Sequence, residues 1–183
     1  KPGDWVAVHG AGGVGLSAVQ IAAALGKNVI AVDIDDAKLE KAKQEGAVAV
    51  VNAKRDKVPE AIKEITKGGA HASIEALGVR ETTTNSVLSL RRGGRHVQIG
   101  LTTKEEGGMV PLPVDLFTAM ELEFVGSFGN PHPDYAGLLA LIAQGKLNPK
   151  SLISREVSLE EVSDVFRAMS EFKTMGFHVI TRF

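Results

Sequence analysis

The stretch VHGAGGVG at residues 8–15 contains four glycines and directly follows a run of strand-forming residues. Glycine inside a regular element costs roughly 0.5–1 kcal/mol relative to alanine, so this cluster indicates a place where something must approach the backbone. Gly10, Gly12 and Gly15 fit the pattern G-x-G-x-x-G. In that pattern the first glycine permits a tight turn, the second admits a pyrophosphate, and the third lets the helix pack on the strand. The amides and the dipole of the first helical turn would then face the phosphates.

An acidic residue stands at the expected distance from these glycines. Asp33 ends the second predicted strand, 18 positions after Gly15, close to the spacing of about 20 in dinucleotide-binding units. Its carboxylate can accept hydrogen bonds from both hydroxyls of an adenosine ribose, and it would repel a 2′-phosphate. We therefore expect NAD rather than NADP as the ligand. The alternative is that Asp33 only caps the helix that follows.

Two residues after Asp33 are also candidates for the nucleotide site. Ile34 could form one wall of an adenine pocket, and the alternative is a buried structural isoleucine. Lys38 could reach over the ribose or adenine side, and the alternative is a solvated charge on a helix.

Short β-branched runs alternate with helical patterns over the first 130 residues. Strands are expected at residues 4–10, 28–33, 47–52, 71–78, 93–100 and 121–129. Helices are expected at residues 14–25, 35–46, 57–69 and near 81–90. The runs are short and apolar, as in strands buried on both faces, and the alternation implies parallel pairing through right-handed crossovers. The sequence therefore predicts an α/β fold with a Rossmann-type, doubly wound, parallel six-stranded sheet.

A C-terminal tail of helices and strands follows this sheet domain. We expect a helix up to about residue 145, an extended stretch at 152–158, a helix at 159–169 and a strand at 177–183. The division expected is a nucleotide-binding domain at residues 1–130 and a tail at residues 131–183. The glycine- and proline-containing stretch at residues 104–113 is expected to be a loop.

Composition narrows the class of partner. The 183 residues carry a formal net charge of -1, which gives no electrostatic footprint for nucleic acid or an anionic membrane. No apolar run reaches the ~18 residues of a membrane span. The chain has no cysteine, which excludes disulfides and thiolate metal sites and fits a cytoplasmic location. Because KPGDWVAV leads at once into a core strand, we expect a preceding segment.

The stretches KPGDWVAVHGAGGVG, AVDIDDAKLEKAKQEGA, EALG and HVQIG resemble the cofactor-binding half of the medium-chain dehydrogenase/reductase family, especially its zinc-dependent alcohol dehydrogenase branch. The resemblance spans essentially the whole chain. It implies hydride transfer between NAD and a primary or secondary alcohol, or the aldehyde or ketone. It also implies cofactor contacts beyond the glycine pattern, each with an alternative explanation in packing: Gly13 and Val14 beneath the pyrophosphate and nicotinamide, Ala76 and Leu77 near the riboses, Ile99, Gly100 and Leu101 at the carboxamide, and Ser127 and Phe128 beside the nicotinamide.

The same resemblance implies that the metal chemistry lies outside this chain. In the zinc branch an upstream domain holds a catalytic zinc through cysteine, histidine and acidic residues, and this chain has no cysteine. The tail would return to that domain, and the chain alone would be inactive. Near the carboxyl end His178 stands where the family often has an arginine at the pyrophosphate, with Arg182 further along.

The remaining titratable residues show no catalytic pattern. The five histidines have no ligand spacing. His9 and His71 are interpreted as satisfied structural residues, and His132 as exposed in a proline-rich loop. Glu75 and Asp115 appear as isolated acids without a base or nucleophile nearby in the sequence.

Several alternatives remain open from the sequence. The sixth strand ELEFVGSFG is apolar for an edge strand, and the resemblance implies a homodimer through it; coverage by the tail is the alternative. A zinc-independent quinone or enoyl reductase of the same superfamily is a second reading, although such enzymes usually favour NADPH. A non-catalytic nucleotide-binding module and a methyltransferase are further readings.

Overall fold

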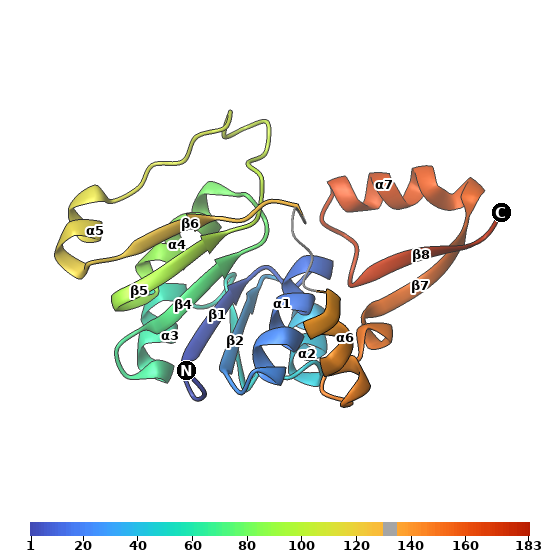
Figure 1. Ribbon diagram of the computed structural model, residues 1–183. Helices are drawn as coiled ribbons and strands as arrows, with labels where there is room; N and C mark the ends of the chain where they lie inside the picture. Colours follow the sequence, from blue (N-terminus) through green and yellow to red (C-terminus); the bar gives the residue numbers. More distant parts are fainter. Residues whose placement is uncertain (130–134) are drawn as a thin grey trace.

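The computed structural model describes residues 1–129 and 135–183 (Figure 1). The predicted position of His132 lies outside these residues. The first part of the chain forms, in order, β1 (Trp5–His9), α1 (Gly13–Ala24), β2 (Asn28–Asp33), α2 (Asp36–Gln44), β3 (Ala49–Asn52), α3 (Val58–Thr66), β4 (Ala70–Glu75), α4 (Arg80–Leu88), β5 (Leu90–Gln98), α5 (Val114–Met120) and β6 (Glu123–Gly126).

The strands form one parallel sheet in the order β3-β2-β1-β4-β5-β6. The chain winds outward from β1 to β3, returns to β4 beside β1, and winds outward the other way. The strand order therefore reverses between β1 and β4, where open α/β sheets bind their ligands at the carboxyl ends of the strands. The predicted fold class, a doubly wound six-stranded sheet, is confirmed.

Alternate residues of the central strands build two apolar layers, one on each face of the sheet. On one face Val8 of β1 and Val29 of β2 pack with Leu16 and Val19 of α1. On the other face Ile30 of β2 packs with Val58 and Ile62 of α3, together with Ala7 of β1. The central strands are buried on both sides, as the sequence predicts for a parallel sheet.

The sequence analysis placed the start of one strand wrongly and missed one helix. β5 begins at Leu90 rather than at residue 93, and it runs through the pair Gly93-Gly94. Its register with β4 shifts between Ala70 and Ala72, and this irregularity accommodates the glycines. The sequence analysis also missed α5, a helix of only seven residues that begins after Pro113.

The tail contains α6 (Tyr135–Ala143), the 3-10 helix η1 (Pro149–Leu152), β7 (Ile153–Ser158), a second 3-10 turn η2 (Leu159–Glu161), α7 (Val162–Ser170) and β8 (Phe177–Arg182). β7 and β8 pair in parallel as a separate two-stranded sheet. Figure 1 shows this small sheet and α7 together, set apart from the main sheet.

A buried polar cluster joins the tail to the first two helices. The Glu45 carboxylate accepts hydrogen bonds from Gln20 Nε2 at 2.6 Å and Ser151 Oγ at 2.7 Å, and it pairs with Lys41 Nζ at 2.7 Å. Burial alone would raise the pKa of Glu45, but these donors lower it overall. Gln20 Oε1 also accepts from the backbone N–H of Asn148 at 3.0 Å. The cluster therefore fixes the start of η1 against α1 and α2.

Candidate functional site

The glycine loop between β1 and α1 is shaped by close backbone contacts at two of its glycines. Gly10 has φ of +95°, and a Cβ there would lie 2.8 Å from Leu77 Cγ. A Cβ on Gly15 would lie 1.7 Å from the Gly10 carbonyl oxygen, so α1 can approach the loop only with glycine at this position. These two positions agree with the turn and packing roles that the sequence pattern predicts.

Gly12 differs from its neighbours because it faces open space. A Cβ added there would have no heavy atom within 4 Å. Gly12 is also the N-cap of α1, and no side chain caps the first turn of that helix. Backbone N–H groups at such an uncapped turn are available to an anion. The structure thus leaves room at the position where the sequence predicts a pyrophosphate.

The space beside Gly13 is occupied by the tail. A Cβ on Gly13 would lie 2.9 Å from Phe177 Cε1 and 3.0 Å from the Gly176 carbonyl oxygen. Gly13 therefore has a packing reason to be glycine that lies about 160 positions away in the sequence. Its predicted contact with a pyrophosphate stays a prediction.

Asp33 ends β2 beside the glycine loop and is 8% exposed. Its Oδ2 accepts a hydrogen bond from the Ala11 backbone N–H at 2.8 Å. Its Oδ1 accepts from the N–H groups of Ile34 at 2.8 Å and Asp35 at 3.1 Å. The capping alternative was wrong, because Asp35 is the residue that caps α2, through the Ala37 N–H at 2.8 Å. Asp33 instead ties the glycine loop to the end of β2.

A cavity of about 760 Å³ lies along this edge of the sheet. Five residues that the sequence analysis singled out line it, namely Gly10, Asp33, Ile34, Lys38 and Leu77. The sequence analysis missed four other residues that line the same cavity at the end of β3 and just after it, which are Asn52, Ala53, Lys54 and Arg55. These residues could have been predicted from the doubly wound strand order. β3 lies next to β2 in the sheet, so the carboxyl ends of both strands lie at the same edge.

Lys38 is not a solvated helix charge, and that alternative was wrong. The residue is 9% exposed, and its Nζ donates a hydrogen bond to the carbonyl oxygen of Phe172 at 2.8 Å. Phe172 and Glu171 of the tail also line the cavity. Lys38 therefore faces the cavity, as the nucleotide hypothesis requires, and at the same time holds the tail over it.

The predicted contacts of the nicotinamide end lie at the same edge of the sheet but outside this cavity. Three apolar side chains among them are open to solvent, with exposed fractions of 49% for Val14, 73% for Leu101 and 78% for Phe128. Ile99 and Gly100 follow β5 and donate their N–H groups to the Glu75 carbonyl oxygen, and Ser127 follows β6 and donates to the Gln98 carbonyl oxygen. Ala76, predicted near the riboses, follows β4 and donates its N–H to the His9 carbonyl oxygen.

Glu75 is the centre of a buried network rather than an isolated acid. Its carboxylate accepts hydrogen bonds from the N–H groups of Leu77 and Gly78, from Thr82 Oγ1 at 2.7 Å and from Gln98 Nε2 at 2.6 Å. The residue is fully buried. Gln98 Nε2 also donates to the Gly100 carbonyl oxygen at 2.8 Å. The network therefore fixes the loops after β4 and β5 to each other.

His96 extends this network into the sheet. Its Nε2 lies 3.0 Å from Gln98 Oε1, an acceptor, so the proton belongs on Nε2. Its Nδ1 then accepts from the hydroxyls of Ser73 at 3.2 Å and Ser86 at 3.1 Å. Burial lowers the pKa of His96.

His9 does not fit the interpretation of a satisfied structural histidine. It is 1% exposed, and among the described residues neither ring nitrogen has a hydrogen-bond partner. Burial, with a smaller contribution from His96, lowers the pKa of His9 to about 3. His9 is thus a neutral polar group at the edge of the cavity. His71 fits its structural interpretation, because its Nδ1 accepts from the Trp5 N–H at 3.0 Å.

His178 is not among the residues that line the nucleotide cavity. It lines a cavity of about 260 Å³ between α7 and the β7–β8 sheet, where its Nδ1 has no hydrogen-bond partner among the described residues. Over residues 1–129 and 135–183, no group of three or more histidine, aspartate or glutamate side chains could hold a metal ion. The residues described here therefore do not fit a zinc site.

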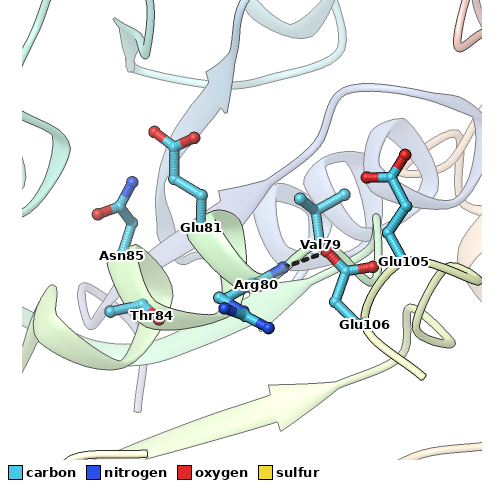
Figure 2. A pocket seen from close by; sticks show the side chains of 7 residues that line it. All are labelled: Val79, Arg80, Glu81, Thr84, Asn85, Glu105 and Glu106. Atoms are coloured by element: carbon cyan, nitrogen blue, oxygen red, sulfur yellow. Dashed lines mark hydrogen bonds between the residues drawn. The ribbon is translucent and has the colours of Figure 1, made fainter. Parts of the chain in front are cut away.

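A separate cavity of about 520 Å³ lies at the start of α4 (Figure 2). Glu81, Glu105 and Glu106 line it together with Arg80. The Arg80 backbone N–H donates to Glu106 Oε1 at 3.3 Å, and the Thr103 hydroxyl also donates to Glu106. These donors, the Thr103 hydroxyl foremost, lower the pKa of Glu106.

No helix in the described part of the chain is both long and apolar enough to cross a membrane.

The comparisons with known proteins agree with this geometry. A family model described as zinc-binding dehydrogenase matches residues 13–144. An alcohol dehydrogenase of Geobacillus stearothermophilus is 40% identical over 96% of this chain and 50% of its own length. An NAD-dependent alcohol dehydrogenase of Sulfurisphaera tokodaii is 32% identical over 96% of this chain and 49% of its own length.

A solved structure gives the same picture. The alcohol dehydrogenase TADH from Thermus sp. ATN1 matches with a TM-score of 0.88 and 29% identity, over 100% of this chain and 52% of its own. The chain thus spans about half the length of the curated relatives and solved structures that it matches.

Proposed function

This chain belongs to the zinc-binding dehydrogenase family, and from that membership we propose that it is the cofactor-binding part of an NAD-dependent alcohol dehydrogenase. The observation that carries the proposal is the open space at Gly12 next to the buried carboxylate of Asp33. The relatives' names favour an alcohol dehydrogenase over a quinone or enoyl reductase, a methyltransferase or a non-catalytic module.

The pyrophosphate of NAD would lie at Gly12 and the first turn of α1. A Cβ at this position would meet no heavy atom within 4 Å, so a phosphate group has room to approach the backbone there. The N–H groups of an uncapped helical turn donate hydrogen bonds to phosphate oxygens, and the helix dipole adds a favourable field. The residues present therefore fit a pyrophosphate.

Asp33 would hold the adenosine ribose. An ionised carboxylate has about four acceptor positions, and three of those of Asp33 are used by the Ala11, Ile34 and Asp35 N–H groups. One position on Oδ2 is left for a ribose hydroxyl. A 2′-phosphate placed there would face a carboxylate that the backbone holds in position, and the resulting repulsion favours NAD over NADP.

The chemical roles divide between this chain and the rest of the protein. Bound NAD supplies the hydride acceptor for an alcohol, or in reverse NADH supplies the hydride for an aldehyde or ketone. The residues of this chain bind and orient the cofactor. The zinc that the family name implies would be held by residues other than those described here, because the described residues do not form a metal site.

We also propose a homodimer through β6. Among the described residues this strand pairs only with β5, and all four of its residues are exposed, including Phe124 at 41% and Val125 at 40%. In the described part of the chain the tail strands form their own sheet, which favours pairing of β6 with a second copy over coverage by the tail. An exposed apolar edge strand can pair with the same strand of a second copy. Gel filtration of the Phe124→Lys variant against the wild-type chain tests this.

We propose that the chain has two parts and that the protein is cytoplasmic. Residues 1–130 would form the nucleotide-binding domain, and residues 131–183 would pack in part against another domain of the protein. The exposed apolar side chains of α7, such as Phe166 at 65% and Met169 at 52%, support that contact. The lack of cysteine fits the reducing cytoplasm.

The proposal is tested by titrating the 183-residue chain with NADH and NADPH and following nicotinamide fluorescence. We expect clear preference for NADH. The Asp33→Ser variant should raise the ratio of NADPH to NADH affinity on the order of a hundredfold, because a held carboxylate no longer faces the 2′-phosphate. Equal affinity of the wild-type chain for both cofactors would refute the role of Asp33.

The Asp35→Ser variant is the matched control. Asp35 lines the same cavity and caps α2, and serine is an equally good N-cap. This variant removes one negative charge at the cavity without removing the proposed ribose acceptor. A ratio that changes as much in Asp35→Ser as in Asp33→Ser would mean that Asp33 acts only through the general field of the cavity.

A further inference from the structure

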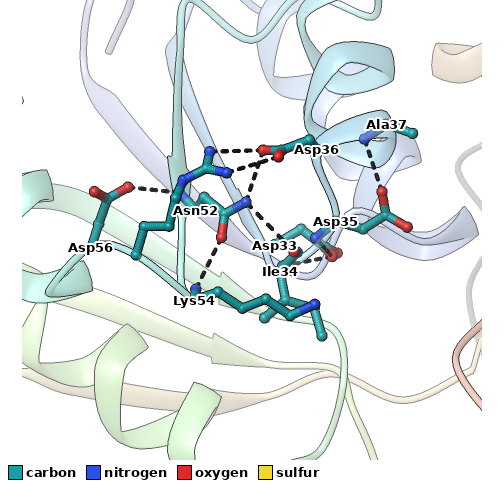
Figure 3. Close-up of polar contacts among 9 residues, drawn as sticks. Asp33, Ile34, Asp35, Asp36, Ala37, Asn52, Lys54 and Asp56 are labelled. Carbon is teal, nitrogen blue, oxygen red and sulfur yellow. Dashed lines mark hydrogen bonds and ion pairs between the residues drawn. The ribbon is translucent and has the colours of Figure 1, made fainter.

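An ion pair lies at the rim of the nucleotide cavity next to Asp33. Arg55 Nη1 donates to Asp36 Oδ2 and Arg55 Nη2 donates to Asp36 Oδ1, both at 2.8 Å, so the pair is bidentate. Asn52 Nδ2 also donates to Asp36 Oδ1 at 2.8 Å (Figure 3). Arg55 first and Asn52 second lower the pKa of Asp36 to about 2. Asp36 is therefore a carboxylate at any ordinary pH.

The backbone places this pair beside the proposed ribose site. Asn52 is the register partner of Asp33 across β2 and β3. The Ala53 N–H donates to the Asp33 carbonyl oxygen at 3.0 Å, and the Arg55 N–H donates to the Asn52 carbonyl oxygen at 3.0 Å. Asp33, Asp36 and Arg55 all line the same cavity. The guanidinium is thus anchored one short turn from the residue that would face the 2′ position of the ribose.

A free guanidinium at this rim would suit a phosphate. Arginine binds phosphate oxygens in the same bidentate geometry that it uses for a carboxylate. Here the carboxylate of Asp36 already fills that geometry. Lys38 is likewise engaged, by the Phe172 carbonyl. Around the cavity five carboxylates stand against three cationic side chains, which makes the site unfavourable for a dianionic group.

We propose that Asp36 is a second specificity-determining residue for the cofactor: by engaging Arg55, it withholds from the ribose the cavity's bidentate phosphate-binding group. The preference for the unphosphorylated ribose is then set by two carboxylates with different actions. Asp33 repels a 2′-phosphate directly, and Asp36 occupies the Arg55 guanidinium, which would otherwise bind the phosphate in bidentate geometry. This inference rests on the proposed function, because it concerns the adenosine end of the same cofactor site.

The effect of Asp36 is expected to be smaller than that of Asp33. The ion pair is exposed, with side-chain exposures of 62% for Arg55 and 66% for Asp36. Water screens such a pair, so a bound phosphate can compete for the guanidinium. In the Asp33→Ser background, where the direct repulsion is gone, Asp36→Asn should raise the ratio of NADPH to NADH affinity about fivefold.

The experiment compares four variants by fluorescence titration with NADPH and NADH at one ionic strength. They are Asp33→Ser, Asp33→Ser with Asp36→Asn, the same pair with Arg55→Gln added, and Asp33→Ser with Glu40→Gln. Glu40 is the matched control, because it is an exposed carboxylate on the same helix, paired with Lys43 at 3.2 Å and absent from the cavity lining.

The gain in the ratio of NADPH to NADH affinity should appear with Asp36→Asn, vanish when Arg55→Gln is added, and be absent with Glu40→Gln. An equal gain with Glu40→Gln would overturn the inference, because loss of any nearby charge would then suffice. A gain that survives Arg55→Gln, or no gain with Asp36→Asn, would overturn it as well. If the wild-type chain binds neither cofactor, the proposed function itself fails, and this outcome is distinct from an unchanged ratio in a chain that binds NADH.

Discussion

The carboxyl ends of β2 and β4 each carry a buried carboxylate beside a glycine, and the two ends are built differently. Glu75 at β4 is fully buried and accepts hydrogen bonds from two backbone N–H groups and two side chains. Asp33 at β2 lines a cavity and accepts from three backbone N–H groups, which leaves one acceptor position. The first carboxylate serves the protein itself, and the second has capacity for a ligand.

The glycines near these two carboxylates, Gly12 after β1 and Gly100 after β5, differ in the same way. A Cβ on Gly100 would lie 2.2 Å from the Gly78 nitrogen and 2.6 Å from Glu75 Oε2, because the loops after β4 and β5 touch. A Cβ on Gly12 would meet nothing within 4 Å. Each of the two places thus has an acidic residue at a strand end and a glycine nearby. They differ in the space around these residues, which is filled by protein at Glu75 and open at Gly12.

Removing the Glu75 carboxylate should have the largest effect on stability. The Glu75→Ala variant leaves the Leu77 and Gly78 N–H groups without their acceptor and removes one of two acceptors from both Thr82 and Gln98. We expect the free energy of unfolding to fall by on the order of 3–5 kcal/mol, because each buried donor left unsatisfied costs about 1–3 kcal/mol. Urea unfolding followed by circular dichroism measures this.

Glu75→Gln is the milder companion to that variant. It keeps one acceptor oxygen and should cost about 1–3 kcal/mol. The comparison between the two strand ends breaks if Glu75→Ala changes stability by less than 1 kcal/mol but weakens NADH binding, because Glu75 would then be a ligand group like Asp33.

The sequence was sufficient for the fold because its signals are local. Each short β-branched run followed by a helical pattern implies one parallel strand and its crossover, and four such units with two further strand runs imply the six-stranded sheet. The start of β5 could not be predicted in this way, because Gly93 and Gly94 are typical of a turn. In the structure the strand continues through these glycines, where its register with β4 shifts. Tertiary pairing overrode the local preference.

The site could be predicted where it depends on strand ends and not where it depends on distant contacts. Asp33 and Gly12 follow from the spacing of one βαβ unit. The partner of Lys38 is the Phe172 carbonyl, 134 positions away, and the residue that packs on Gly13 is Phe177. No local pattern contains such pairs, since they depend on how the tail folds back over the loop.

His9 offers an intermediate effect that appears only in acid. It is the register partner of Glu75 in β1 and β4, so it lies at the boundary between the two ends. Its pKa is lowered from 6.5 to about 3 by burial. As the pH falls below about 6.5, His9 is protonated in the unfolded chain but stays neutral in the folded chain. The free energy of unfolding therefore decreases as the pH falls toward 3, and it is nearly independent of His9 above pH 7.

The His9→Leu variant should lack this acid sensitivity. Relative to the variant, the wild-type chain should lose about 2 kcal/mol of unfolding free energy between pH 6.5 and pH 5. His96, whose pKa is also lowered, adds the same slope to both proteins and cancels in the difference. Urea unfolding at pH 7, 6 and 5 provides the test, and parallel pH profiles of the two proteins would show that His9 is protonated in the folded state.

Gly12→Ala should have the smallest effect on stability and still damage binding. The added Cβ meets no protein atom within 4 Å, and φ at Gly12 is −79°, which alanine adopts freely. The poorer N-cap and the reduced entropy of the unfolded chain oppose each other, so the unfolding free energy should change by no more than about 0.5 kcal/mol.

NADH affinity of this variant should fall at least about tenfold, because the methyl group occupies the approach of the pyrophosphate to the backbone. Adenosine, which lacks the pyrophosphate, serves as the control ligand, and its affinity should stay the same. A variant that binds NADH as tightly as the wild-type chain would show that the open space at Gly12 is not the phosphate site.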